Sequence, residues 1–314
     1  MSYSGIVIEG PLGGGELVVF WSEDYVVAGI GFETTVKSKD VAESLLQQPI
    51  AGVRVVAPRP ATVAEVTAVH DPDYVRALEE GDPSGLAASN GIGWDPGLLD
   101  GVLASTGGVR DAVLLALAER VHTGSLSSGL HHARFGEGAG FCTINGIVVA
   151  ARAALAAGAR RVLIVDFDAH CGGGTASLIE DLSGVEQIDV SVVPYDFYSS
   201  RDGARLTLAD ADECLDACRL ALAGVRNPEE IDVVIYNAGM DPHEGAGGLI
   251  GITTDVLAER EGLFFDWAEE HGLPVAFVLA GGYLQGVGLD ELVGLHRLTI
   301  RQAAAVMQTP TAAA

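Results

Sequence analysis

Apolar residues along this chain fall in short, uninterrupted runs that alternate with longer segments of helical periodicity. The runs, rich in Val and Ile, predict buried strands at 17–21, 53–56, 125–128, 162–166, 188–193, 231–237 and 275–279. The periodic segments predict helices at 64–69, 73–80, 98–121, 144–157, 212–223, 254–271 and 289–306, with others inside 33–48 and from 175. We expect the helix over 98–121 to be interrupted at Gly107 and Gly108. This alternation predicts an α/β protein with a mainly parallel sheet of about eight strands and helices on both faces.

The composition shows no shift along the chain, so we expect residues 1–314 to form a single domain. The Ala-rich segment 308–314 is expected to be a flexible tail. The longest apolar stretches are broken by Arg, Asp or Gly, and the chain does not start with a basic and then an apolar segment. Four cysteines in so long a chain do not make a disulfide framework. These features predict a cytoplasmic protein without a membrane span.

The run at 162–166 ends in charged residues, which is unusual for a buried strand. Asp166, Asp168 and His170 follow at every second position, and alternate side chains of an extended chain share one face. Like charges at the end of a buried strand need a positive partner. A divalent metal is the simplest candidate, whereas a helix-capping Asp and a structural His would be the ordinary interpretation.

Three other predicted loops also carry polar residues just past a strand. They contain the pair His131 and His132, then Asp241, then Tyr283 after two glycines. Ligands of parallel sheets bind outside the carboxyl ends of the strands, so we expect the four loops to be neighbours. We expect the adjacent His131 and His132 to point in different directions, so that they can serve two functions. Each loop alone also has an ordinary interpretation: a pair of loop histidines, a turn-forming Asp-Pro, or a core Tyr beside a turn.

Taken together, the loops predict an open metal site. Asp168, His170 and Asp241 offer two oxygens and one nitrogen, which leaves room for water and substrate. Such a mixed donor set accepts zinc, and also iron(II) or cobalt. One histidine of the pair could serve as a general base and the other as an acid, and Tyr283 could donate to a developing oxyanion.

The formal charge of −25 narrows the class of partner. It argues against a nucleic-acid surface, because phosphates are bound by Lys and Arg. It suits a small cationic amine or a basic peptide as substrate, although acid spread over the surface for solubility explains it equally well.

The order of these motifs resembles the histone deacetylase superfamily, which includes acetylpolyamine amidohydrolases and acetoin-utilisation proteins. The resemblance covers most of the chain and rests on five ordered blocks. They are His70-Asp71-Pro72-Asp73-Tyr74; His131-His132-Ala133 with Gly140-Phe141-Cys142; Asp166-x-Asp168-x-His170; Gly239-Met240-Asp241; and Gly281-Gly282-Tyr283.

The resemblance implies an arginase/deacetylase-like three-layer fold with one catalytic zinc ion. Carried over by position, the implied metal ligands are Asp168, His170 and Asp241. The implied catalytic residues are His131 and His132 as the acid/base pair, Tyr283 as the oxyanion donor, and Asp166 as the residue that holds His131. The implied substrate channel contains Gly140 and Phe141, and the implied structural potassium site contains Asp166, Asp168 and Ser191.

The chain also departs from the family pattern. Where the family has His-His-Gly followed by Asp or Asn, this chain has His170-Cys171-Gly172-Gly173. Gly173 cannot orient the second histidine, so His132 is expected to lack its usual partner. The N-terminal part, 1–52, is divergent as well, with Phe32 and Glu33 where many members carry a His-Pro-Glu segment.

The leading hypothesis is a zinc-dependent amidohydrolase that releases an acyl group from an acetylpolyamine, an acetylated lysine peptide or a similar amine. One alternative is a deacetylase-like binding or regulatory protein with weakened catalysis, which Gly173 favours. Another is a ureohydrolase of the same fold with two manganese ions. That reading is disfavoured because glycines 172–174 occupy the place of a further bridging carboxylate. Neither a homo-oligomer nor a monomer is indicated.

Overall fold

The computed structural model describes residues 15–308, and its centre is one eight-stranded sheet with the order β2-β1-β3-β8-β7-β4-β5-β6. Every strand pair in this sheet is parallel. The strands are β1 (Leu17–Phe20), β2 (Val53–Val56), β3 (Thr123–Ser125), β4 (Val162–Asp166), β5 (Val185–Ser191), β6 (Ala204–Leu208), β7 (Val233–Asn237) and β8 (Val275–Val278). The predicted α/β class and parallel sheet are confirmed.

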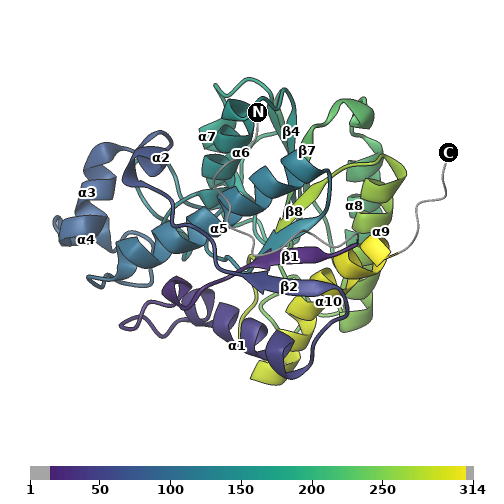
Figure 1. Cartoon of the computed structure of the whole chain (residues 1–314), viewed down its shortest axis with the longest axis horizontal. Helices are drawn as coiled ribbons and strands as arrows, with labels where there is room; N and C mark the ends of the chain where they lie inside the picture. The colour runs from purple at the N-terminus through teal and green to yellow at the C-terminus, as the bar shows by residue number, and fades with distance from the viewer. Residues whose placement is uncertain (1–14, 309–314) are drawn as a thin grey trace.

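Helices cover both faces of the sheet (Figure 1). They are α1 (Glu33–Gln47), α2 (Val63–Thr67), α3 (Pro72–Glu80), α4 (Ser84–Ala87), α5 (Leu98–Glu119), α6 (Gly146–Ala156), α7 (Gly173–Ile179), α8 (Cys214–Ala223), α9 (Thr254–Glu270) and α10 (Leu289–Gln308), with short 3-10 turns at Glu23–Tyr25 and Pro228–Glu230. Helices α1, α8, α9 and α10 contribute to one hydrophobic core, and α2, α3, α5, α6 and α7 contribute to the other.

The three layers follow from the alternation of side chains along each strand. In β4, Leu163 and Val165 belong to the core under α8–α10, and Val162 and Ile164 belong to the core under α5 and α6. Successive strand side chains point to opposite faces, so a strand that is apolar throughout must be covered twice. This is why the uninterrupted Val- and Ile-rich runs were visible in the sequence.

Helix α5 differs from its prediction, because it runs without a break through Gly107 and Gly108. A Cβ at Gly107 would lie 2.0 Å from the Arg59 carbonyl oxygen, and one at Gly108 would lie 1.6 Å from the Tyr25 hydroxyl. The two glycines therefore permit close packing and do not end the helix. Among the described residues, α5 is also the one helix long and apolar enough to cross a membrane, but 78% of its apolar window is buried in the protein, as in a core helix.

The other differences lie at the edges of elements. Strand β6 was not predicted. It is an edge strand that pairs only with β5, and its side chains range from buried to exposed, so it lacks an uninterrupted apolar run. The third strand is β3 at Thr123–Ser125 and not 125–128. The loop predicted over 81–96 contains the single turn α4. Of the predicted tail 308–314, Gln308 ends α10 and the remainder lies outside the described residues, as do residues 1–14 of the N-terminal part.

A buried histidine ties the α2–α3 segment to the loop that follows β3. His70 is fully buried, its Nδ1 donates to the Arg134 carbonyl oxygen at 2.7 Å, and its Nε2 accepts from the Asn145 N–H at 3.0 Å. One nitrogen donates and the other accepts, so the neutral ring satisfies both partners and a charged ring cannot. Burial accordingly lowers the pKa of His70 to about 4.

We predict that His70 makes folding sensitive to mild acid. Its folded pKa lies below the ordinary value of 6.5. Its contribution to stability is therefore complete above pH 6.5 and is lost as the pH falls toward 4, when the unfolded chain takes up the proton first. The loss should be about 3 kcal/mol.

The measurement is the free energy of unfolding by denaturant between pH 7 and pH 4.5, for the wild type and His70→Gln. The variant should be less stable at pH 7 and should show a shallower pH dependence. An unchanged pH slope in the variant would contradict the assignment.

Candidate metal centre and catalytic site

The four polar loops leave strands that are neighbours in the sheet. The strand order places β3, β8, β7 and β4 side by side, all with their carboxyl ends at one edge. The loop after β3 carries His131, that after β8 carries Tyr283, that after β7 carries Asp241 and that after β4 carries Asp168. The expectation that these loops meet in space is therefore confirmed.

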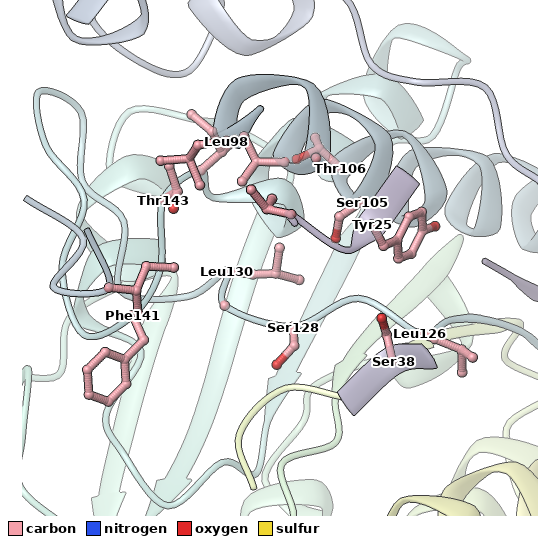
Figure 2. Close-up of a pocket in the computed structure, with 16 residues that line it drawn as sticks. Tyr25, Ser38, Leu98, Ser105, Thr106, Leu126, Ser128, Leu130, Phe141 and Thr143 are labelled. Carbon is pink, nitrogen blue, oxygen red and sulfur yellow. The ribbon is translucent and has the colours of Figure 1, made fainter. Parts of the chain in front are cut away.

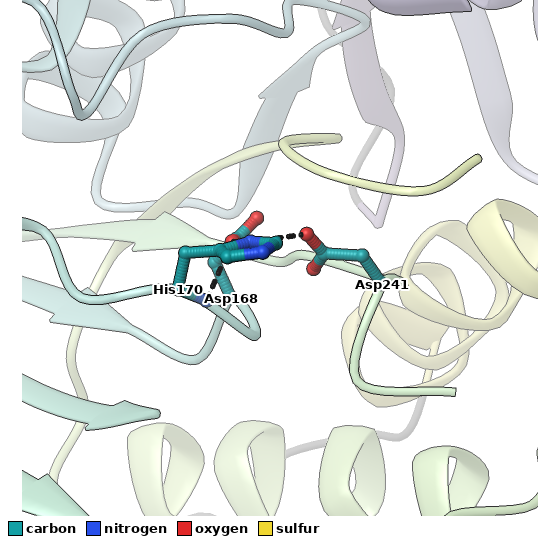
Figure 3. Close-up of side chains that lie close together, drawn as sticks. All are labelled: Asp168, His170 and Asp241. Carbon is teal, nitrogen blue, oxygen red and sulfur yellow. Dashed lines mark hydrogen bonds and ion pairs between the residues drawn. The ribbon is translucent and has the colours of Figure 1, made fainter. Parts of the chain in front are cut away.

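Asp168, His170 and Asp241 form the centre of this edge (Figure 3). Their potential ligand atoms all lie within 4.8 Å of one another. His170 Nδ1 faces both carboxylates, at 3.0 Å from Asp241 Oδ2 and 3.3 Å from Asp168 Oδ1. Backbone N–H groups hold the other oxygens: Gly281 donates to Asp168 Oδ2 at 2.8 Å, and Ala169 donates to Asp241 Oδ1 at 3.0 Å.

The protein backbone is shaped closely around these carboxylates. A Cβ at Gly281 would lie 2.1 Å from Asp241 Oδ2 and 2.6 Å from Asp168 Oδ2. Only glycine therefore lets the β8 loop pass over the site. Both carboxylates are fully buried, and their ion pairs in the described part of the chain are with histidines.

The electrostatics of this group indicate a cation site. Burial, together with the charge of Asp168, raises the pKa of Asp241. Burial lowers the pKa of His170, but the Asp168 and Asp241 carboxylates outweigh it and raise that pKa to about 10. Two buried carboxylates and one imidazole nitrogen converging on one point fit a divalent metal bound by two oxygens and one nitrogen.

The histidine pair lies beside this centre with its rings close together. The ring centroids of His131 and His132 are 3.9 Å apart, so the two side chains do not point apart as expected. They do have separate partners. His131 Nδ1 lies 2.9 Å from Asp166 Oδ2, and Asn237 donates to the other oxygen of Asp166 at 2.8 Å.

The second histidine also has a carboxylate partner, contrary to the expectation from Gly173. His132 Nδ1 lies 3.0 Å from Oδ2 of Asp196, a residue on the loop after β5. The sequence analysis missed Asp196 because it considered only the position after His170-Cys171-Gly172. The available signal was an acidic residue five positions past a buried strand that neighbours β4.

The two histidines have opposite tendencies to carry a proton. Burial lowers the pKa of His131, but Asp166 and Asp168 outweigh it and raise that pKa to about 10. Burial and the charge of His131 lower the pKa of His132 to about 4. At neutral pH the pair therefore consists of one charged ring and one neutral ring, which is the arrangement that an acid and a base require.

A cavity of about 580 Å³ opens over the candidate metal site. Its wall includes His132, His170 and four residues with aromatic or small side chains, namely Gly140, Phe141, Tyr195 and Tyr283. The Phe141 and Tyr283 rings are 6.0 Å apart, and Phe32 packs against Phe141 at 4.5 Å. The predicted channel residues and the predicted oxyanion donor thus line one cavity with the histidines.

A second, narrow space of about 30 Å³ is lined by Phe141 and Leu130, among other residues (Figure 2). It extends beneath α5 toward Tyr25, whose hydroxyl pairs with Ser125 Oγ at 3.0 Å.

The predicted potassium site stays a prediction. Asp166 is buried, and its Oδ1 accepts from the N–H of Asp168 at 3.2 Å. Ser191 Oγ donates to Asp189 Oδ1 at 2.5 Å. Asp189 is a further buried carboxylate that the sequence analysis did not single out, and burial with the charge of Asp166 raises its pKa well above the ordinary range.

Comparison with known proteins agrees with this geometry. The sequence model of the histone deacetylase domain matches residues 32–293. An uncharacterized protein of Picosynechococcus is 33% identical over 243 residues, which cover 75% of this chain and 80% of that protein. A probable deacetylase of Methanothermobacter thermautotrophicus is 28% identical, over 73% of this chain and 74% of its own length.

More distant similarities point the same way. The acetoin utilization protein AcuC of Bacillus subtilis is 28% identical over 60% of this chain, which spans 56% of AcuC. The crystal structure of the HDA15 HD domain superposes with a TM-score of 0.74 at 20% identity, covering 95% of this chain and 92% of that one, and so shows the same fold. The buried ligand set, the paired histidines and the match over 32–293 lead to one conclusion: this chain belongs to the histone deacetylase domain family.

Proposed function

We propose that the protein is a metal-dependent amidohydrolase that hydrolyses the acyl amide of an acylated amine, such as an acetylpolyamine or an acetyl-lysine. Membership of the histone deacetylase family supports a deacetylase-type hydrolase. The observation that carries the proposal is the position of His132 and His170 on the wall of one cavity, with Asp168 and Asp241 buried beneath.

Asp168, His170 and Asp241 would hold the metal, with zinc, iron(II) and cobalt all compatible with two oxygens and one nitrogen. When bound, the metal would polarise the acyl carbonyl and lower the pKa of the attacking water. The Gly281 and Ala169 N–H groups keep the two carboxylates in place for it.

The remaining steps are proton transfers by residues of this chain. The neutral ring of His132 accepts the proton of the water that adds to the carbonyl carbon. Tyr283, on the same cavity wall, donates a hydrogen bond to the oxyanion. The C–N bond then breaks, and a protonated histidine supplies the proton with which the amine leaves.

The cavity suits an aliphatic arm that ends in a charged group. Phe141 and Tyr195 line the cavity and would flank such an arm with aromatic surface, while the exposed Glu137 also lines the cavity. An apolar wall with an acidic residue near it favours a cationic amine, and the net charge of −25 acts in the same direction. We propose a small cationic acylated amine or an acetylated lysine peptide as substrate.

The alternative of a binding protein with weakened catalysis loses its main support, because Asp196 provides the carboxylate that Gly173 lacks. The alternative of a binuclear ureohydrolase has no observation in its favour. In the described part of the chain, one group of three potential ligands was found.

We predict that turnover requires the metal ligands. Asp241→Ala should lose bound metal and lower kcat by at least about 10³-fold, which corresponds to roughly 4 kcal/mol of transition-state stabilisation. Fluorogenic acyl-lysine and acetylpolyamine panels measure the turnover, and elemental analysis measures the metal. Asp202→Ala, at an exposed position, is the matched control.

In the same assay a chelator should abolish turnover, and zinc, iron(II) or cobalt should restore it. Full turnover of the Asp241→Ala protein, or of chelated wild type across both panels, would contradict a metal-dependent hydrolase.

A separate prediction concerns the oxyanion donor. Tyr283→Phe should lower kcat by about 10²- to 10³-fold with little change in KM, because the hydroxyl acts mainly in the transition state. Metal content and thermal unfolding temperature should stay at their wild-type values. A Tyr283→Phe protein with unchanged kcat would refute the role of this hydroxyl.

A further inference from the structure

The loop after β5 places the carboxylate of Asp196 against His132, although Asp196 lies outside the motif that begins at Asp166. Oδ2 of Asp196 accepts from His132 Nδ1 at 3.0 Å and from the Gly174 N–H at 2.9 Å. Its Oδ1 accepts from the Arg134 guanidinium. The Asp196 side chain is only 7% exposed, so three donors hold a buried carboxylate in one orientation.

The position of Asp196 depends on Gly173. A Cβ at Gly173 would lie 2.2 Å from the backbone oxygen of Asp196 and 2.6 Å from its Oδ1. A side chain at 173 and this conformation of the β5 loop therefore exclude each other. The glycine that seemed to remove the partner of His132 is what makes room for a different one.

The backbone at Asp196 is held in an uncommon conformation. Its φ is +58°, in the left-handed region that few residues other than Gly, Asn and Asp adopt. Next to it, the Tyr195 ring meets His132 edge-on, with centroids 5.0 Å apart and planes at 90°. Two successive residues of one tight turn thus contact the same imidazole.

We propose that Asp196 is the positioning residue of the catalytic base and takes over the role of the side chain absent at position 173. By accepting a hydrogen bond from the Nδ1–H group, its carboxylate keeps His132 in one tautomer and one ring orientation. Nε2 is then the nitrogen that receives the proton of water when the C–O bond forms. The same proton, or one from the neighbouring histidine, leaves with the amine when the C–N bond breaks. This inference rests on the proposed function for its catalytic consequence, but the tautomer is a property of the protein alone.

The first test uses two substitutions that suit the backbone at position 196. Asp196→Gly fits φ +58° and removes the carboxylate, while Asp196→Asn keeps one acceptor oxygen. We expect kcat to fall by about 10²- to 10⁴-fold in the Gly variant and less in the Asn variant, with KM nearly unchanged. Formate should restore part of the activity of the Gly variant. Asp202→Gly is the control at an exposed position of the same segment.

The second test does not depend on turnover. Nitrogen-15 NMR of the histidine rings, without metal, should show His132 with its proton on Nδ1 in the wild type. The Asp196→Gly protein should show a mixture of both tautomers. A His132→Gln spectrum identifies the signal. If the wild type hydrolyses no acyl substrate, the proposed function fails while this readout still decides the role of Asp196.

A third variant tests the link to Gly173. Gly173→Ala should displace the β5 loop and reproduce the tautomer mixture of Asp196→Gly. Gly262→Ala is its matched control, because a Cβ at this helical glycine meets nothing within 4 Å. The inference is overturned if Asp196→Gly keeps wild-type kcat, or if it loses activity while His132 keeps its single tautomer.

Discussion

Two buried carboxylates that converge on one imidazole are the constraint on which this structure depends. Asp168 and Asp241 are both fully buried, and their described ion pairs are with histidines alone. Such an arrangement costs free energy unless a cation joins it. The protein limits the cost by donating a backbone N–H to each carboxylate, and the loop over them can only be built from glycine. Those features fix the geometry of the two carboxylates.

The parallel sheet explains how residues far apart in sequence reach this point. Asp168 and Asp241 are separated by 73 positions along the chain but leave adjacent strands, β4 and β7, at the same edge. Helices on both faces bury the central strands β3, β8, β7 and β4 throughout, so their carboxyl ends hold fixed positions. The two histidines and Tyr283 come from β3 and β8, next in the sheet order. The parallel sheet of the histone deacetylase fold therefore brings all of these site residues together at one edge.

The pair of carboxylates behind the histidines shows how a site can keep its geometry while its motif changes. Asp166 comes from the expected strand and lies against His131, whereas Asp196 comes from the next loop and lies against His132. The lost side chain and the new carboxylate compete for the same space, because a Cβ at Gly173 would overlap the backbone of Asp196. The motif alone leaves His132 without a partner, whereas the structure gives this histidine a buried carboxylate.

The sequence by itself determined the fold class, most strand positions and the group of residues at the carboxyl ends of the strands. Those depend on local signals, namely apolar runs and polar residues just past them. It could not determine that Gly107 and Gly108 continue a helix, because close approach of Arg59 and Tyr25 from other segments decides it. Nor could it find Asp196, whose role depends on how a loop folds back across space toward His132. Only the tertiary structure decides such contacts, because they join residues with no fixed spacing along the chain.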